Sequence, residues 1–292
     1  MPAGRFAPSP SGDLHLGNLR TALLAWLCAK STGRQFLIRV EDLDQQRCKP
    51  EFEVTQLADL AALGIESEGP IVRQSERLHL YERVIEHLVA EGRTYECFCT
   101  RREILEVASA PHQRAGAYPG TCRELSASDR ARLRLERPGA LRLRADAEQW
   151  TVEDLLHGPV VGHLDDLVIR RNDGTPAYNL AVVLDDAWQD VTQVVRGDDL
   201  LFASPPQAYL ASVLGVNVPE YVHVPLVLNA EGKRLAKRDG AVTLRDLAPE
   251  KAWHLIVESL GLGGDTPAEV LESFSFDQLP REPWVFVPDV SG

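Results

Sequence analysis

Apolar residues recur at helical spacing in three stretches between residues 14 and 92. The first stretch has leucines at positions 16, 19, 23, 24 and 27, and the stretches 51–66 and 75–92 repeat the pattern. An apolar residue at every third or fourth position places one apolar stripe along a helix. The pattern therefore predicts three helices, with Asp13 as the N-cap of the first.

Short, continuous apolar runs alternate with these helices and predict strands. The runs are at 35–40, 167–170, 177–184, 191–196 and 221–228, with a short strand or edge at 71–75. Asn172, Asp173 and Gly174 predict a hairpin turn between the second and third runs. Helices are expected again at 207–214 and 253–260. Strands that alternate with helices are typical of an α/β fold with a Rossmann-type parallel sheet.

The pattern is interrupted between residues 94 and 165, which carry closely spaced cysteines, many arginines and little sustained alternation. We therefore expect a sheet domain in two halves, at residues 1–93 and 166–245. An inserted subdomain occupies residues 94–165, and a short helical or irregular tail occupies residues 246–292.

The charge distribution limits the classes of partner. The formal net charge is −12 over 292 residues, which argues against a protein that binds nucleic acid through its overall charge. Two local segments are basic, with ten arginines against five acids at 101–144 and five basic residues against two acids at 231–245. Residues 246–292 reverse this, with nine acids against two basic residues.

Other features of the composition favour a cytoplasmic protein without membrane attachment. No apolar run approaches the roughly 18 residues of a membrane helix, and the N-terminus lacks the pattern of a signal peptide. The five cysteines are odd in number and unevenly spaced, which argues against a disulfide framework.

The chain from Arg5 to Asn18 forms a candidate phosphate site. Prolines and a glycine keep residues 8–12 out of helix, and His15 and Asn18 lie three apart on one side of the first helical turn. Free backbone N–H groups and the helix dipole favour an anion there. Gly17 leaves room for a flat base against the backbone. The alternative is an ordinary capped helix with a surface histidine.

A basic loop, Lys233-Arg-Leu-Ala-Lys-Arg238, supplies the complementary charge. Lys237 in such a loop can neutralise the charge that develops as pyrophosphate leaves ATP. A solvated surface loop is the alternative. Taken together, the two segments predict an ATP site formed by His15, Gly17, Asn18 and Lys237.

These two segments resemble the two signatures of class I aminoacyl-tRNA synthetases. The sequences that begin at Arg5, Arg39 and Lys233 are similar to the glutamyl branch of that class, and the resemblance covers about residues 4–245. Ala236 stands where the second signature usually has a serine. Asn18 replaces the usual final residue of the first signature. The resemblance implies that His15, Asn18 and Lys237 are catalytic, with ATP and Mg²⁺.

The same resemblance implies a glutamate pocket. The residues that it assigns to this pocket are Arg5, Ala7 to Ser9, Glu41, Tyr178 and Arg196. Glu41 and Arg196 end predicted strands, where open α/β sheets bind ligands. By charge, we expect Arg196 to bind the side-chain carboxylate and Glu41 the ammonium group. Helix capping is the alternative for some of the acids at 41, 42 and 44, and core packing is the alternative for Tyr178.

Three cysteines in the inserted segment predict a metal site. Cys97, Cys99 and Cys122 lie within 26 residues of a chain that we expect to be cytosolic, which favours one structural Zn²⁺ per chain. The resemblance implies Tyr118 as the fourth ligand, whereas His112 is chemically more ordinary. Three unconnected reduced cysteines are the alternative.

The acceptor is inferred from the acidic C-terminal segment. Full glutamyl-tRNA synthetases carry a large helical region that reads the anticodon, whereas here 55 residues follow Lys237. A short chain of this pattern resembles the glutamyl-queuosine tRNA(Asp) synthetases. That resemblance implies activation of L-glutamate by ATP without tRNA, followed by transfer to queuosine in the anticodon stem-loop of tRNA(Asp). We expect a monomer that holds the stem with its basic segment at 101–144.

Three alternative functions stay open from the sequence. One is a truncated glutamyl-tRNA synthetase that charges a tRNA 3′ end. Another is a non-catalytic paralogue that binds glutamate or tRNA, which the presence of His15 and Lys237 opposes. The third is a metabolic adenylyltransferase of the same sheet type, which the carboxylate pocket and the cysteine-containing insertion oppose.

Overall fold

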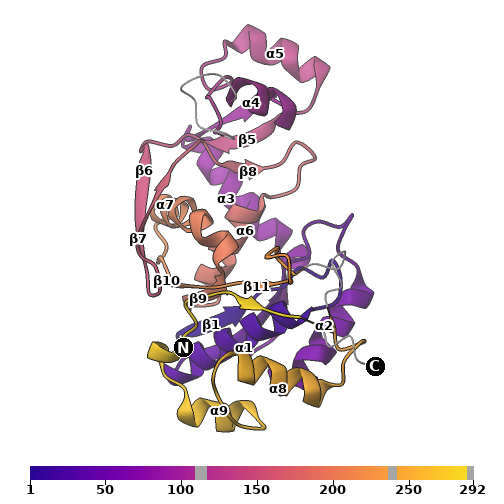
Figure 1. Cartoon of the computed structure of the whole chain (residues 1–292). Helices are drawn as coiled ribbons and strands as arrows, with labels where there is room; N and C mark the ends of the chain where they lie inside the picture. Colours follow the sequence, from indigo (N-terminus) through magenta and orange to yellow (C-terminus); the bar gives the residue numbers. More distant parts are fainter. Residues whose placement is uncertain (109–116, 236–241, 288–292) are drawn as a thin grey trace.

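The computed structural model describes residues 1–108, 117–235 and 242–287 (Figure 1). The α-helices are α1 (Leu16–Ser31), α2 (Pro50–Ala62), α3 (Leu78–Ala90), α4 (Arg101–Ala108), α5 (Ala127–Glu136), α6 (Tyr178–Trp188), α7 (Ser204–Leu214), α8 (Pro249–Ser259) and α9 (Pro267–Ser273). Short 3-10 helices are η1 (Gln74–Arg77), η2 (Asp198–Ala203) and η4 (Phe276–Gln278). Within these residues, no helix is long and apolar enough to cross a membrane.

The strands form one large sheet and two small ones. They are β1 (Ala3–Phe6), β2 (Gln35–Val40), β3 (Val72–Arg73), β4 (Thr94–Cys97), β5 (Ala140–Leu143), β6 (Gln149–Asp154), β7 (Gly158–His163), β8 (Val168–Arg170), β9 (Val191–Gly197), β10 (Glu220–Val224), β11 (Val227–Leu228) and β12 (Trp284–Val285). The large sheet has the order β3-β2-β1-β9-β10-β6-β7. All its pairs are parallel except β6 with β7, which confirms the expected α/β class.

The order of the strands reverses at β1. The chain passes from β1 through α1 to β2 on one side, and β9 pairs with β1 on the other. In open α/β sheets, ligands bind at the carboxyl ends of the strands near such a reversal. The candidate residues Arg5, Glu41 and Arg196 lie on or directly after β1, β2 and β9.

Alternating side chains divide the core between the two faces of the sheet. Phe36 and Ile38 of β2 pack with α1 and α8 on one face, whereas Leu37 packs with Val194 of β9 on the other. A second core lies among α3, α6 and α7 on that other side. Gly4 permits the close approach of β1 to α1, because a Cβ there would lie 2.8 Å from Cβ of Ala29.

The smaller sheet, β4-β5-β8, is antiparallel and lies toward the end of the molecule that carries α4 and α5 (Figure 1). Strands β6 and β7 extend from this region back to the large sheet, where Asp154 pairs with Tyr221 of β10. Sheet membership therefore does not follow the expected boundaries of residues 94 and 165. β6 and β7 belong to the large sheet, and β8 belongs to the small one.

One predicted strand is a helix in the structure. The run 177–184, expected as a strand, forms α6 instead. The predicted turn is present, with Gly174 at a φ of +87°. The strand expected after the turn is reduced to a single bridge between Arg170 and Pro176. An apolar run of eight residues does not distinguish a strand from a helix that is buried on most sides.

The start of α1 also differs from the prediction. Its N-cap is His15 rather than Asp13. The His15 side chain accepts a hydrogen bond from the Asn18 backbone N–H, and the Asn18 side chain accepts one from the His15 backbone N–H. Because of this reciprocal capping box, the N-cap lies two residues after Asp13, the residue that capping preferences favour.

The C-terminal segment is part of the core. Trp253 and Ile256 of α8 and Val270 of α9 pack against α1 in the first core. The buried Arg20 of α1 donates to Ser259 Oγ at 3.0 Å, and β12 pairs with β11. These residues therefore support the helix that carries His15 rather than forming a separate tail (Figure 1).

Candidate active site

The loop after β1 is held against the carboxyl end of β2. The Glu41 backbone N–H donates to Pro8 O at 2.9 Å. The buried side chain of Gln56 in α2 donates through Nε2 to Ser9 O at 3.1 Å and Gly12 O at 2.6 Å. These contacts fix the backbone from position 8 to position 12 without using helix or sheet hydrogen bonds.

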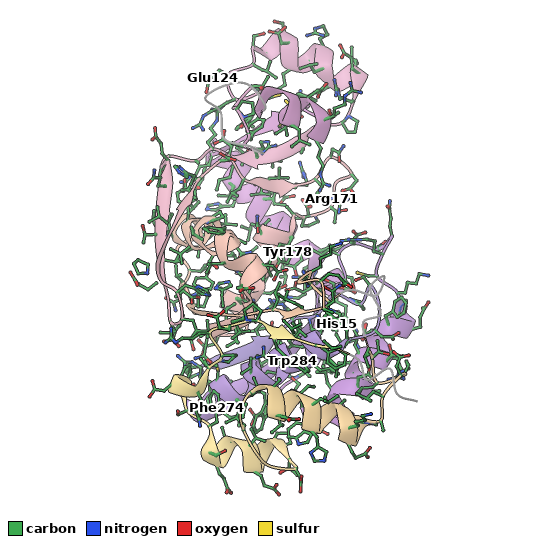
Figure 2. The ribbon with its side chains drawn as sticks, viewed as in Figure 1. His15, Glu124, Arg171, Tyr178, Phe274 and Trp284 are labelled. Carbon is green, nitrogen blue, oxygen red and sulfur yellow. The ribbon has the colours of Figure 1, made fainter. Side chains whose placement is uncertain are left out.

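His15 is neutral and has a defined tautomer. Burial lowers its pKa to about 4, with a smaller effect from the charge of Arg234. Its Nδ1 accepts the Asn18 backbone N–H at 3.3 Å, so the ring proton is on Nε2. The candidate phosphate site therefore offers an imidazole N–H donor at a helix N-terminus (Figure 2).

Both ends of the basic loop reach this helix terminus. Before the loop, Leu235 N donates to Val227 O at 3.0 Å, and a Cβ added at Gly17 would lie 3.3 Å from Val227 Cβ. After the loop, Leu16 N donates to Val242 O at 3.0 Å. The candidate residue Lys237 and its neighbour Ala236 lie outside the described residues.

A buried ion-pair network lies beneath the expected glutamate pocket. Arg5 makes a bidentate contact with Asp186 of α6, at 3.2 and 3.3 Å. The fully buried Arg39 donates to Asp186 Oδ1 at 2.7 Å and to Glu41 Oε1 at 3.1 Å. Burial raises the pKa of Glu41, although Arg39 and Arg5 act to lower it. An incoming ammonium group would favour its charged form.

Asp185, the neighbour of Asp186, is equally well satisfied. Its carboxylate accepts hydrogen bonds from Gln74 at 2.9 Å, Arg77 at 2.8 Å and Tyr81 at 2.7 Å. Sequence reasoning missed both aspartates and Arg39. Two adjacent acids in an apolar stretch are the signal that could have identified them, since buried carboxylates need partners.

Arg196 has two of its three guanidinium nitrogens bound. Nε donates to Nε2 of the buried His223 at 2.9 Å, and Nη2 donates to Ser204 Oγ at 2.8 Å. Nη1 is buried and has no hydrogen-bond partner among the described residues. A buried guanidinium with an unused donor is suited to an anionic ligand.

Tyr178, which Figure 2 labels, is the first residue of α6 and lines a cavity together with Glu41. Partial burial and the Glu41 carboxylate raise the pKa of Tyr178, whereas Arg196 and Arg5 lower it. Tyr178 therefore lies close enough to Glu41, Arg5 and Arg196 for their charges to affect its ionisation. The alternative of core packing does not fit, because the side chain is 42% exposed.

The cavity has a volume of about 1070 Å³ and joins the two parts of the molecule. One wall holds Ser9, Glu41 and Tyr178, and the opposite wall includes Arg101 and Arg137 of the insertion. A ligand larger than an amino acid can therefore reach the pocket from the side of the small sheet.

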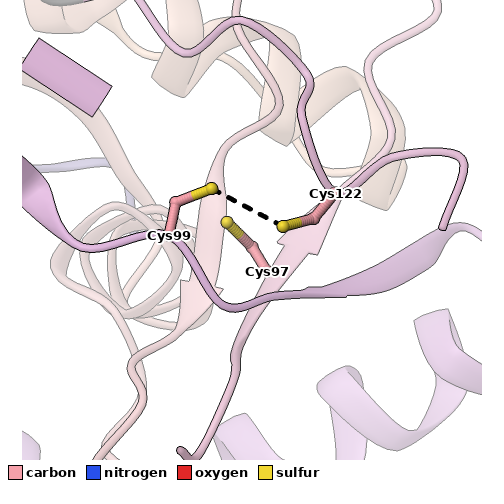
Figure 3. Close-up of side chains that lie close together, drawn as sticks. All are labelled: Cys97, Cys99 and Cys122. Carbon is pink, nitrogen blue, oxygen red and sulfur yellow. Dashed lines mark hydrogen bonds between the residues drawn. The ribbon is translucent and has the colours of Figure 1, made fainter. Parts of the chain in front are cut away.

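Three cysteines of the insertion form a compact cluster (Figure 3). The sulfur atoms of Cys97, Cys99 and Cys122 lie within 4.8 Å of one another. A tetrahedral zinc site with Zn–S bonds of about 2.3 Å places its sulfurs roughly 3.8 Å apart. Burial and the two neighbouring thiols raise the pKa of Cys99 to about 12, so this thiol needs a nearby cation to ionise.

The phenol of Tyr118 lies against this cluster. Its oxygen accepts from Cys97 Sγ at 3.4 Å and from the Cys122 backbone N–H at 2.9 Å. The guanidinium of Arg142 lies over the tyrosine ring at 3.7 Å. Three cysteine sulfurs fit the donor set of a structural Zn²⁺, and the Tyr118 oxygen stays the candidate for the fourth position. The alternative ligand His112 lies outside the described residues.

Several arginines of the basic segment are paired with acids at or near the surface. Arg134 contacts Glu96 at 2.6 Å, and Arg144 contacts Glu124 at 2.9 Å. Arg137, on the cavity wall, contacts Glu103 at 3.1 Å. Arg101 forms no ion pair within the part of the chain that the structure describes. The local excess of positive charge is therefore smaller than the sequence count indicates.

Comparisons with known proteins agree on one family. The model of the catalytic domain of class I tRNA synthetases (E and Q) matches residues 3–280. The solved glutamate tRNA ligase from Elizabethkingia meningosepticum, in complex with its amino acid, has a TM-score of 0.81 at 28% identity. It covers 97% of this chain, which spans 66% of the ligase. The chain is therefore a class I tRNA synthetase of the E and Q type.

Curated relatives give the branch within that class. A glutamyl-Q tRNA(Asp) synthetase from Nocardia farcinica is 60% identical, over 97% of this chain and 92% of the relative. One from Cutibacterium acnes is 50% identical, over 89% and 76%. A glutamate–tRNA ligase from Geobacter sulfurreducens is 40% identical over 98% of this chain but only 63% of the ligase. This chain belongs to the glutamyl-Q tRNA(Asp) synthetase family.

Proposed function

We propose that the protein activates L-glutamate with ATP and transfers it to queuosine in the anticodon stem-loop of tRNA(Asp). The observation that carries the first half is the arrangement of charges at the carboxyl ends of β1, β2 and β9. A buried acid, Glu41, and a buried guanidinium with an unused donor, Arg196, suit an amino acid that is itself an acid.

The pocket assigns a role to each end of glutamate. Arg196 binds the side-chain carboxylate, and Glu41 binds the ammonium group. Arg5, Ala7 to Ser9 and Tyr178 shape the remaining wall, because the loop is fixed by Pro8 O and Ser9 O. Arg39 and Asp186 hold the charges of this wall in place from beneath. Glutamate thus presents its α-carboxylate toward the N-terminus of α1.

Activation takes place at the helix terminus. The glutamate α-carboxylate attacks the α-phosphorus of ATP, and pyrophosphate leaves. The Nε2–H of neutral His15 donates to the phosphate, and Asn18 keeps that tautomer through its backbone N–H. Gly17 lets the His15 ring and Val227 lie close to the backbone at this terminus, because a Cβ there would lie 3.0 Å from the ring and 3.3 Å from Val227 Cβ. We infer that Lys237 binds the leaving phosphates, because the chain on both sides of its loop is tied to this terminus. Mg²⁺ would neutralise the phosphates further.

The second step uses the cavity between the two walls. A hydroxyl of the queuosine cyclopentenediol attacks the carbonyl of the adenylate, and AMP leaves. The cavity volume of about 1070 Å³ suits a nucleoside that enters from the side of the insertion. Arg101, Arg137 and Arg171 line this cavity, which supports them as contacts for the phosphates around the nucleoside. We propose tRNA contacts for these residues rather than for all ten arginines of the basic segment.

Zn²⁺ has a structural role in this proposal. Cys97, Cys99, Cys122 and Tyr118 would hold one ion per chain, which ties β4 to the loop that carries Tyr118 and Cys122. The ion would keep one wall of the cavity in shape. All five cysteines are free thiols, which fits a cytoplasmic protein, and we expect it to act as a monomer.

The acceptor is tested by acylation with labelled glutamate. tRNA(Asp) is prepared from cells that make queuosine and from cells that do not. We expect incorporation only into the tRNA with queuosine, and none into tRNA(Glu). Equal incorporation without queuosine, or into the 3′ end of tRNA(Glu), would contradict the proposed acceptor and favour an ordinary glutamyl-tRNA synthetase.

A further inference from the structure

Arg196 is supported by a chain of buried groups that spans three neighbouring strands. Arg196 is on β9, His223 is on β10, and Asp154 ends β6. All three side chains are less than 9% exposed. Charged and polar groups this deeply buried are retained only where their hydrogen bonds are made.

Hydrogen bonding fixes the proton positions along this chain. Arg196 Nε donates to His223 Nε2 at 2.9 Å, so Nε2 must carry a lone pair. The ring proton is therefore on Nδ1, which donates to Asp154 Oδ2 at 2.7 Å. Burial lowers the pKa of His223, and the charge of Arg196 lowers it further, although Asp154 acts to raise it. The imidazole is thus a neutral acceptor for the guanidinium.

Asp154 is itself held as an anion in one orientation. Its Oδ1 accepts the backbone N–H groups of Leu156 and His157, and its Oδ2 accepts the N–H of His223 as well as Nδ1–H. Burial raises its pKa, but these hydrogen bonds outweigh that effect and leave the pKa below its usual value. Because four N–H groups donate to Asp154 and no group accepts from it, its side chain is a carboxylate rather than a protonated carboxyl group.

The hydrogen-bonded series that begins at Asp154 ends at the guanidinium of Arg196. Nε is bound by His223, and Nη2 is bound by Ser204 Oγ at 2.8 Å. Ser204 Oγ also lies 3.2 Å from His223 Nε2. Nη1 has no partner among the described residues. The orientation of the free donor is therefore set by His223 and Ser204, since a planar fork bound at two nitrogens cannot rotate.

We propose that Asp154 and His223 are positioning residues that orient Arg196 for the side-chain carboxylate of the amino-acid substrate. The inference deepens the proposed function and rests on it, since it takes Arg196 to be the group that binds that carboxylate. Asp154 fixes the tautomer of His223, and His223 presents the lone pair that holds Arg196. The two residues act through Arg196 and touch no reacting atom.

The test compares glutamate with glutamine in ATP–pyrophosphate exchange. Asp154→Asn replaces the carboxylate oxygen that accepts from His223 Nδ1–H with an amide NH₂ group. Two donors would then face each other, which disturbs the tautomer of His223. We expect KM for glutamate to rise about tenfold or more, and KM for ATP to stay within about twofold. The preference in kcat/KM for glutamate over glutamine should fall by about tenfold. A loss of folded protein alone would not change that preference.

A pair of substitutions at His223 keeps the test decisive if Asp154→Asn does not fold. His223→Gln places an amide oxygen near the position of Nε2, where it can still accept from Arg196. His223→Asn places its amide near Nδ1 and leaves Arg196 without that acceptor. We expect His223→Gln to keep most of the preference for glutamate and His223→Asn to lose it.

The matched control is His163→Gln. His163 is exposed at the end of β7, outside the series of groups that runs from Asp154 to Arg196. It should keep the kinetics of the unmodified protein. If the unmodified protein lacks glutamate-dependent exchange, the proposed function fails and this inference fails with it. If it shows exchange, and both the asparagine and the glutamine variants at His223 keep the preference, this inference alone is overturned.

Discussion

The amino-acid pocket and the insertion both carry many arginines, but they use them in opposite ways. In the pocket, Arg39 is fully buried and pairs with Asp186 at 2.7 Å. In the insertion, Arg132 pairs with Glu136 at 2.8 Å, with the two side chains 62% and 49% exposed. The separations are nearly equal, so the difference lies in the surroundings rather than in the contact.

This difference explains what each region can bind. Removing one member of a buried pair leaves a charge without water or partner, so the pocket keeps one arrangement and can select a small ligand. An exposed pair contributes about 0–1 kcal/mol, so its arginine can exchange a carboxylate for a phosphate at little cost. The first arrangement suits glutamate, and the second suits a nucleic acid backbone.

The stability of the insertion must therefore come from a source other than its surface ion pairs. We expect Cys97→Ser to lower bound zinc from about one ion per chain to nearly none, and to make residues 94–148 sensitive to protease. Metal analysis and limited proteolysis measure these effects. Cys48→Ser is the control, because Cys48 lies far from the cluster in sequence and is not among its sulfurs. A protein that binds no zinc before substitution would contradict the account.

The buried network should dominate the stability of the pocket. Asp186→Ala leaves Arg5 and Arg39 without their shared carboxylate, and we expect the free energy of unfolding to fall by about 3–5 kcal/mol. Glu136→Ala in the insertion should change it by less than about 0.5 kcal/mol. Urea denaturation measures both. Similar losses in the two variants would show that burial does not separate the two regions.

His15 should add a pH dependence to the stability of the sheet domain. Its pKa is about 4 in the folded protein, below the ordinary value of 6.5. The unfolded chain therefore takes up the proton first, and stability from this group is lost as the pH falls from 6.5 towards 4. When the pH is lowered from 7 to 5, the free energy of unfolding should fall more for the unmodified protein than for the His15→Gln variant. Equal losses would show that the imidazole is not desolvated.

The smallest effect is expected at the cavity rim. Arg171 pairs with Asp173 at 2.8 Å and is nearly half exposed (Figure 2). Arg171→Ala should weaken binding of tRNA(Asp) about threefold and reduce the salt dependence by about one phosphate contact. Exchange without tRNA should not change. Lys251→Ala, which removes the same charge from α8, is the control, and equal weakening there would indicate a general charge effect.

The sequence predicted the parts of the site that depend on local pattern. The strand at 35–40, the position of Glu41 after it, and the cluster of three cysteines are all present as expected. These follow from apolar runs and from spacing within a short segment, which fix local geometry without knowledge of the rest of the chain.

The parts that were missed depend on contacts between distant segments. Asp186 meets Arg5 across 181 residues, and Asp154 meets His223 across 69. No periodicity links such residues, because their meeting depends on the order of strands in the sheet. The same reason explains the error at 177–184, where packing on most sides, rather than the local pattern, determines that the run is a helix.

The central claim is that the glutamate pocket is complete in the protein alone, since its charges are already held by Arg39, Asp186 and His223. The direct measurement is ATP–pyrophosphate exchange with the purified protein, with L-glutamate and no tRNA. We expect exchange that depends on glutamate, is much weaker with glutamine, and does not increase when tRNA is added. Exchange that appears only after tRNA is added would contradict a pocket formed in advance.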